Sequence, residues 1–101
     1  MKQTLISYVV RRECSEENAR LIQDVFKELK ETAPPELQYL VLRAADGQFF
    51  HFVQAPDSAK PFTESEAFAA FLRNIKERFI VPVQRTEVTI LGSYGMAKGD
   101  L

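Results

Sequence analysis

Hydrophobic and polar residues follow strand-like or helix-like spacing in six successive segments of the chain. The first segment, Thr4 to Val10, is short, apolar and rich in β-branched residues, which predicts a β-strand. Ser15 can then cap a helix, and apolar residues recur after it every three or four positions until Pro34 ends the pattern. The apolar side of this predicted helix consists of Ala19, Leu21, Ile22, Val25, Phe26 and Leu29.

The next two segments, residues 37–43 and 49–54, are strand-like and flank an Asp-Gly pair that is typical of β-hairpins. A two-residue loop at this pair would mix apolar and polar side chains on both faces of the hairpin. A three-residue loop, 45–47, with Gly47 in the left-handed region, would give one purely apolar face: Leu40, Leu42, Phe50 and Phe52. The other face would carry Tyr39, Val41, Arg43, Phe49, His51 and Val53. Because burial sets strand register, we predict the three-residue loop.

The last third of the chain predicts a second helix and a fourth strand. Thr63 and Glu66 have the spacing of a capping box, and a narrow apolar stripe follows: Phe68, Phe71, Leu72, Ile75 and Phe79. Pro82 is expected to stop this helix. The alternation from Gln84 to Leu91 then predicts the last strand, with Thr86, Val88 and Ile90 on one side.

This order of elements predicts an α+β domain of the ferredoxin-like βαββαβ type, a four-stranded antiparallel sheet with both helices on one face. Right-handed crossovers would place the first and third strands in the centre. We expect a single domain, residues 1–95, followed by a flexible tail, residues 96–101. The side of the sheet that faces the helices is expected to carry Leu40, Leu42, Phe50, Phe52, Val88 and Ile90.

The remaining face of the sheet is too apolar for a surface that meets only water. It is expected to carry Val41, Phe49, Val53, Leu91, Leu5 and Val9, interrupted by polar residues. A contiguous apolar patch usually marks an interaction surface, and a two-fold pairing of two copies is the simplest closed assembly. We therefore predict a homodimer through this face. The alternative is a set of scattered exposed apolar residues without a role.

Composition narrows the classes of partner. The chain has 101 residues, a net charge of −1 and both signs of charge spread along it, so it lacks the basic face that nucleic-acid binding requires. No apolar run approaches the ~20 residues of a membrane helix, and the N-terminus has no signal-peptide pattern. Cys14 is the only cysteine, which excludes an intrachain disulfide. We expect a cytoplasmic protein without nucleic-acid or membrane partners, metal or cofactor.

His51, the only histidine, is the single candidate catalytic residue. In an apolar pocket a near-neutral imidazole could take a proton from an activated carbon acid, leaving a carbanion that can react with oxygen. The alternative is a packing histidine bonded to a neighbour such as Tyr39 or Glu87. Arg43 and Arg85 could bind a substrate carboxylate or pair with acidic neighbours. The candidates for the pocket around His51 are Tyr39, Val41, Arg43, Phe49, Glu87 and Thr89.

Two functions fit these patterns. In the first, a homodimeric domain binds a small, partly apolar molecule between helices and sheet or at the paired sheet faces, and a cofactor-free monooxygenase-like reaction is one activity that such a site could support. In the second, the chain is a non-catalytic dimerisation or accessory module whose sheet faces fill each other.

The order and spacing of several short motifs resemble the dimeric α/β-barrel superfamily and its antibiotic-biosynthesis-monooxygenase-like branch. The similarity covers nearly the whole chain and is closest to a group of small bacterial proteins with no established activity. It is carried by Glu17-Asn18, Val25-Phe26, Glu28-Leu29, Leu37-Gln38-Tyr39, Asp46-Gly47, Phe50-His51, Pro61-Phe62-Thr63, Ala67-Phe68, Phe71 and Gly92-Ser93-Tyr94. It implies a homodimer whose sheets face each other, with a small apolar pocket in each subunit. No set of positions matches one branch's catalytic pattern, so no catalytic residue follows from the resemblance.

Overall fold

The computed structural model describes residues 2–55 and 65–96 of the chain. The elements are β1 (Lys2–Val10), the short 3-10 helix η1 (Arg12–Cys14), α1 (Ser15–Thr32), β2 (Gln38–Arg43), β3 (Gln48–Ala55), α2 (Glu66–Leu72), α3 (Ile75–Arg78) and β4 (Phe79–Glu87). Within the described residues, no helix is both long and apolar enough to span a membrane. Of the predicted tail only Met96 is described, so the tail stays a prediction.

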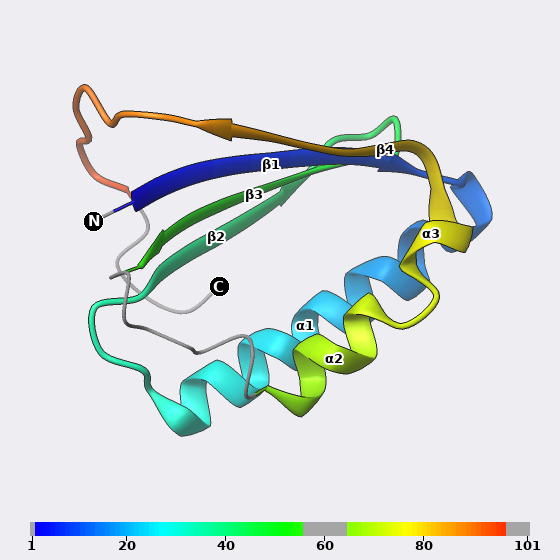
Figure 1. Ribbon diagram of the computed structural model, residues 1–101, viewed down its shortest axis with the longest axis horizontal. Coiled ribbons are helices and arrows are strands. Elements are labelled where there is room, and N and C mark those ends of the chain that lie inside the picture. The colour runs from blue at the N-terminus through cyan, green and yellow to red at the C-terminus, as the bar shows by residue number, and fades with distance from the viewer. Residues whose placement is uncertain (1, 56–64, 97–101) are drawn as a thin grey trace.

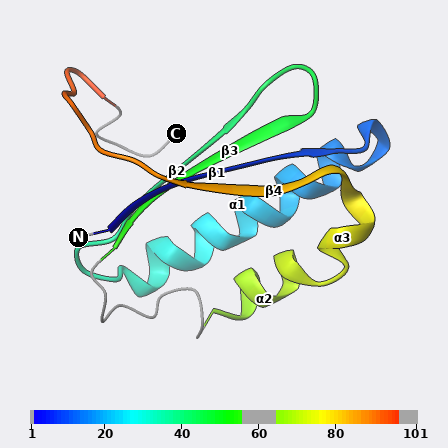
Figure 2. The same cartoon turned by 45° about the horizontal axis from the view of Figure 1, so that its top comes forward.

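The four strands form one antiparallel sheet in the order β2-β3-β1-β4, so β1 and β3 are central, as predicted. The helices α1 and α2 lie side by side against one face of the sheet, and neither covers the other face (Figures 1 and 2). The chain therefore has the predicted ferredoxin-like α+β fold.

The hairpin between β2 and β3 has the predicted register. Arg43 lies opposite Phe49, and the amide of Ala44 donates to the carbonyl oxygen of Gln48 (2.8 Å), which leaves a three-residue loop at 45–47. Gly47 in this loop has a φ of +88°, in the region that favours glycine. Its carbonyl oxygen accepts a hydrogen bond from the amide of Val10 (3.1 Å), so the loop is attached to the end of β1. The prediction of a three-residue loop is confirmed.

The strands β2 and β3 turn their faces the opposite way from the prediction, whereas Leu5 and Val9 of β1 lie on the helix-free face as predicted. Phe49 and His51 are buried beneath the helices, at 1% and 4% exposure, whereas Leu42 is 56% exposed on the other face. The helix-side face carries Ile6, Tyr8, Val10, Tyr39, Val41, Phe49 and His51. The helix-free face carries Leu5, Val9, Leu40, Leu42, Phe50 and Phe52. The expectation that Leu40, Leu42, Phe50 and Phe52 belong to the helix-side core is therefore wrong, as is the placement of Val41, Phe49 and His51 on the open face.

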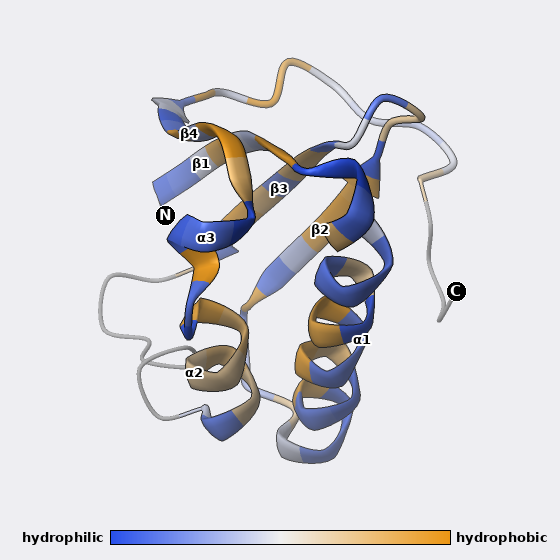
Figure 3. Ribbon diagram, turned by 90° about the vertical axis from the view of Figure 1, so that its right-hand side faces the viewer, coloured by the Kyte–Doolittle hydropathy of each residue, from blue (hydrophilic) through white to orange (hydrophobic). Residues whose placement is uncertain are grey.

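The physical reason for the reversal lies in α1. Asn18 is buried on the sheet-facing side of this helix together with Ile22 and Val25. Apolar residues turn from α1 toward α2 and the sheet, and hydrophilic ones turn outward (Figure 3). A buried amide needs hydrogen-bond partners, and the mixed face supplies them through Tyr8. The purely apolar face would leave Asn18 unsatisfied, so it is the mixed face that the helices cover.

The second helix is divided where one continuous helix was predicted. Thr63 of the predicted capping box lies outside the described residues, and the N-cap of α2 is Ser65, whose hydroxyl oxygen accepts from the amide of Phe68 (2.9 Å). Asn74 adopts a left-handed backbone (φ +60°) between α2 and α3, a conformation that asparagine tolerates better than most residues. Phe79, predicted to be helical, begins β4.

The last strand begins and ends earlier than predicted. Pro82, expected to stop the helix, lies inside β4 where the register between β1 and β4 shifts. An edge strand at an irregularity tolerates proline because no ladder hydrogen bond is lost there. The expectation that Val88 and Ile90 belong to the core is wrong, since both follow β4 and Ile90 is 44% exposed.

Replacing Gly47 with Ala is expected to lower the free energy of unfolding by about 1–3 kcal/mol. The left-handed backbone disfavours a side chain, and the added Cβ would lie 3.1 Å from the carbonyl oxygen of Val10. Gly92→Ala is the matched control, because its Cβ would have no atom within 4 Å. Urea unfolding of both variants measures the difference, and equal stabilities would contradict the loop geometry.

Candidate functional site

A continuous chain of hydrogen bonds crosses the space between the sheet and the helices. The hydroxyl of Tyr39 on β2 bonds Nδ1 of His51 on β3 (2.7 Å), and Nε2 of His51 bonds the hydroxyl of Tyr8 on β1 (2.8 Å). Asn18 of α1 donates from Nδ2 to the Tyr8 oxygen (3.0 Å), and Arg78 of α3 donates from Nε to Oδ1 of Asn18 (3.0 Å). We call these five residues the polar chain. It joins three strands to two helices.

Arg78 is a buried cation, 5% exposed, and no carboxylate of the described residues lies within ion-pair distance of it. Its guanidinium donates to the carbonyl oxygens of Phe71 (2.6 Å) and Arg73 (3.2 Å), at the end of α2. These carbonyls carry the partial negative charge of a helix C-terminus. The Phe71 ring, 5.5 Å from the guanidinium carbon, adds a cation–π contact. Together they substitute for an acidic partner and hold α3 against α2.

His51 is electrically neutral at physiological pH. Burial lowers the pKa of its imidazole from 6.5 to about 4, because the charged form would lose its hydration. Burial also raises the pKa of Tyr8 to about 12 and raises the pKa of Tyr39 above its usual value. His51, Tyr8 and Tyr39 are therefore uncharged at neutral pH, and Arg78 is the only charged member of the polar chain.

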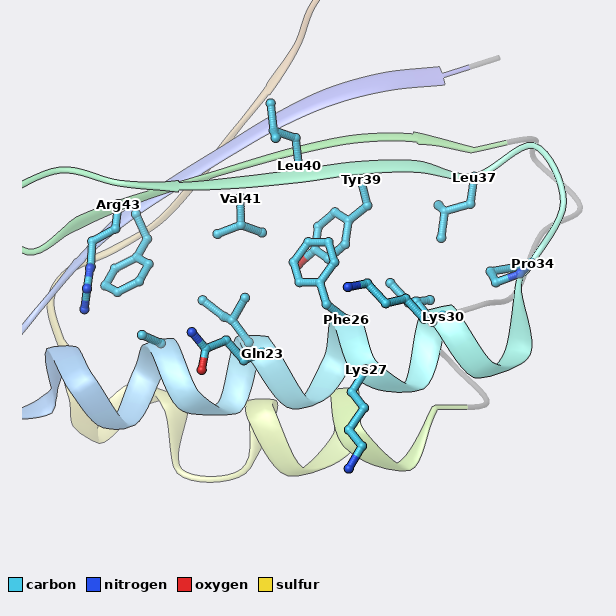
Figure 4. A pocket seen from close by; sticks show the side chains of 14 residues that line it. Gln23, Phe26, Lys27, Lys30, Pro34, Leu37, Tyr39, Leu40, Val41 and Arg43 are labelled. Atoms are coloured by element: carbon cyan, nitrogen blue, oxygen red, sulfur yellow. The ribbon is translucent and has the colours of Figure 1, made fainter. Parts of the chain in front are cut away.

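A groove of about 850 Å³ opens between α1 and β2, at the Tyr39 end of the polar chain (Figure 4). Tyr39 and Val41 point into it from β2, whereas Leu40 points to the opposite side of the sheet. Phe26 of α1 stacks on Tyr39, with ring centroids 4.9 Å apart and planes inclined by 12°. The groove is lined mainly by apolar side chains, and Arg43 stands at one end. The lining therefore combines mainly apolar side chains with four polar ones: Gln23, Lys27, Lys30 and Arg43.

The structure brings most of the predicted site residues together. Tyr39, Val41, Arg43 and Phe49 line the groove, and His51 lies behind Tyr39, bonded to it. Arg43 also pairs with Glu16 at the surface (3.1 Å). Glu87 and Thr89 are not part of this arrangement, because Glu87 is exposed at the end of the edge strand β4 and Thr89 follows that strand. The grouping is on the helix side of the sheet, so the placement of these residues on the helix-free face is wrong, while the space between helices and sheet is one of the two expected ligand locations.

His51 contacts two tyrosines, and one of them, Tyr39, is a neighbour expected for a packing histidine. Glu87, the other expected neighbour, is not its partner. Both ring nitrogens are engaged, and Tyr39 lines the groove whereas His51 does not, so a molecule there would meet Tyr39 before it met the imidazole. The catalytic role of His51 stays a prediction.

Three members of the polar chain were not predicted from the sequence: Tyr8, Asn18 and Arg78. One signal was available: Asn18 lies four positions before Ile22 and seven positions before Val25, in the same helical stripe. A polar residue in an apolar stripe requires a polar partner on the opposing surface. Arg78 gives no comparable signal, because it is one of several charged residues at the end of a predicted helix.

The pH dependence of stability should reveal the buried imidazole. Because the pKa of His51 is lower in the folded chain than its ordinary 6.5, the unfolded chain binds a proton first, and the free energy of unfolding should fall as the pH drops from 6.5 toward 4. The expected loss is about 3 kcal/mol. Urea unfolding at a series of pH values should show this loss in the wild type and not in His51→Gln, so parallel curves for the two would contradict it.

Comparison with known proteins gives similarity at the level of structure. No protein-family model matches the sequence, and no curated protein matches it. A candidate antibiotic biosynthesis monooxygenase from Bacteroides thetaiotaomicron superposes with a TM-score of 0.74 at 10% identity, covering 97% of this chain and 95% of that one. A second, from Nitrosomonas europaea, gives 0.71 at 12% identity and covers 93% of both chains. A protein from Pseudomonas aeruginosa gives 0.68 at 18% identity, covering 90% and 95%.

At these identities the similarity concerns the fold, and fold alone does not assign an activity. The agreement extends over nearly the full length of both chains in each pair. The chain thus has the ferredoxin-like fold found in solved structures that are named antibiotic biosynthesis monooxygenases, as the sequence resemblance implied.

Proposed function

We propose that the chain is a homodimeric domain that binds a small, partly apolar molecule in the groove between α1 and β2. The observation that carries this proposal is the groove itself, which has one buried hydrogen-bonding system at its wall and otherwise mainly apolar lining. Its volume, about 850 Å³, lies within the roughly 300–1,000 Å³ of small-molecule sites. An apolar cleft with a few placed polar groups is the usual form of such a site.

The polar contact in this proposal is the Tyr39 hydroxyl. Its position is supported from two sides, by stacking on Phe26 and by the hydrogen bond to His51. A hydroxyl held in this way loses little conformational freedom when a ligand binds, which favours affinity. Within the described part of the chain the ion-pair partner of Arg43 is the exposed Glu16, a contact weak enough to exchange for an acidic ligand group.

A monooxygenase-like reaction is a more specific part of the proposal. It is supported by the names of the similar solved structures. Such a reaction without a cofactor needs a base to generate a carbanion that can react with oxygen. His51 is the candidate, and its two hydrogen bonds mean that it would act through Tyr39 or after one bond breaks. Binding is therefore the function that the geometry supports best.

The homodimer is supported by the composition of the helix-free face. Besides its apolar side chains, this face carries polar but uncharged residues in the paired strands: Gln3, Ser7, Gln48, Gln54, Gln84 and Thr86. Charged side chains almost always occur on a sheet surface that meets water, and their absence from the described strands here is typical of a surface that is covered. A second copy of the same face would provide a complementary cover of equal composition.

A non-catalytic dimerisation module is the second candidate function. The observation in its favour is that both nitrogens of His51 are already bonded within the chain, which is what a purely structural histidine would show. In this case the groove would carry no ligand, and the paired sheet faces alone would carry the function. Ligand binding distinguishes the two candidates.

Filling the groove should weaken binding of an aromatic acid. We expect 2-naphthoate to bind the wild type and to bind Val41→Phe at least about tenfold more weakly, because the larger ring occupies the space that Val41 faces. Isothermal titration calorimetry measures both affinities. Leu42→Phe adds a ring on the same strand but on the helix-free face, at a residue that does not line the groove, and should bind like the wild type. Equal affinities for the two variants, or no binding to the wild type, would contradict the proposed site.

Charge on the helix-free face should prevent dimerisation. Phe50→Glu is expected to weaken association by about 100-fold or more, because the two-fold axis brings a desolvated carboxylate from each copy into the interface. Lys27→Glu, on the side of α1 that points away from the sheet, is the control and should leave the dimer intact. Sedimentation equilibrium across a dilution series measures association. A wild type that is monomeric at micromolar concentration would argue against the dimer.

A further inference from the structure

The segment that follows β4, residues 88–96, carries exposed apolar side chains and no charge. Leu91 and Tyr94 are each 99% exposed, and Met96 is 57% exposed. Although 27% of the residues of the chain are charged, none of those in this segment is. Exposed segments are usually rich in polar and charged residues, and grouped exposed apolar side chains mark an interaction site. We call residues 88–96 the arm.

The arm is attached to the sheet at a fixed point. The amide of Val88 donates to the carbonyl oxygen of Gln3 on β1 (3.0 Å), and the amide of Ile90 donates to Oε1 of the Gln3 side chain (3.1 Å). Nε2 of Gln3 in turn donates to Oε1 of Gln54 on β3 (2.6 Å). Because β1 begins at Lys2, its pairing with the arm ends here. Gln3 therefore holds the start of the arm at the edge of the helix-free face.

Beyond this point the arm extends away from the sheet of its own chain. It projects past the end of the sheet at which β1 begins, away from the helices (Figures 1 and 2). Packing of Leu91 or Tyr94 on the chain's own sheet would shield these side chains from water, yet both are almost fully exposed. In the single chain, the apolar side chains of the arm and those of the helix-free face are therefore both uncovered.

We propose that the arm of each copy docks on the helix-free face of a second copy, where Leu91 and Tyr94 are buried. This inference rests on the homodimer of the proposed function and names the segment that closes it. Stacked sheets lie about 10 Å apart, and the outer strands of a four-stranded sheet are roughly 15 Å apart. An extended segment of the arm's length spans at most roughly 30 Å. The arm is therefore long enough to cross to the partner and traverse its face.

The composition of the face favours this occupant. Its uncharged polar side chains, such as those of Gln48 and Gln84, can bond the backbone groups of an extended arm. In the described strands this face presents no charge, and neither does the arm, so burial leaves no ion unpaired. Two-fold symmetry makes the contact reciprocal, and one closed assembly then covers two arms and two faces.

Substitutions in the arm test the proposal. Leu91→Ser combined with Tyr94→Ser is expected to weaken association at least about 100-fold, because the symmetric dimer loses the apolar contacts of both arms. Both side chains are exposed in the single chain, so each copy should keep its fold, which far-UV circular dichroism checks. Leu72→Ser removes an exposed apolar side chain from α2 and is the control, which should associate like the wild type. Sedimentation equilibrium across a dilution series measures all three proteins.

A second measurement locates the arm in the dimer. A nitroxide attached to Ser93→Cys, in a chain that also carries Cys14→Ser, marks the arm. This chain is mixed with wild type whose leucine methyl groups are labelled with carbon-13, so that any broadening reports contact between copies. The methyl signals of the helix-free face should broaden more than those of α1, the two sets being Leu5, Leu40 and Leu42 against Leu21 and Leu29.

The outcomes separate this inference from the proposed function. Unchanged association of the Leu91→Ser and Tyr94→Ser double variant, or broadening that is strongest in α1, would overturn the arm contact and leave the homodimer in place. A wild type that is monomeric at micromolar concentration would overturn both. Loss of association in the double variant together with broadening on the helix-free face is the result expected.

Discussion

The hydrogen bond between Arg78 and Asn18 connects parts of the molecule that are far apart in the sequence. It joins α3 to α1, and through Tyr8 it joins both to the centre of the sheet. A buried guanidinium and a buried amide each lose hydration on folding, and each is costly unless its partners are in place. Three features of the fold follow from the need to give these groups hydrogen-bond partners. They are the choice of the covered sheet face, the break between α2 and α3, and the orientation of His51.

The topology and the hairpin register were predictable because they depend on patterns that single residues cannot easily disturb. Strand order follows from the order of elements and the handedness of their connections. The register of β2 against β3 follows from the separation of an apolar set from a mixed set, together with a glycine at the position with positive φ. Both are properties of whole segments, and errors at one or two positions leave them unchanged.

The choice of face was not predictable from hydrophobicity. Burial of the most apolar side would place Leu40, Leu42, Phe50 and Phe52 under the helices, yet the covered side is the one with two tyrosines and a histidine. The contacts that decide which face is covered come from Asn18 of α1 and Arg78 of α3. Both residues are too far from His51 in the sequence for a local pattern to indicate the contact. The same contacts explain the helix boundary, because Arg78 bonds the carbonyl oxygens of Phe71 and Arg73, which a continuous helix would use internally.

Strand β2 is the element that contributes both to the groove and to the helix-free face. Successive side chains on a strand point to opposite sides, so Tyr39 and Val41 face the groove while Leu40 and Leu42 face away from it. β2 is also an edge strand, paired on one side by β3 alone. A displacement of β2 by a molecule in the groove would therefore move apolar side chains on the opposite surface, with one row of hydrogen bonds resisting it. In a dimer paired through that surface, ligand and partner would be coupled through this strand, whereas β1 and β3, held on both sides, would stay in place and keep the polar chain intact.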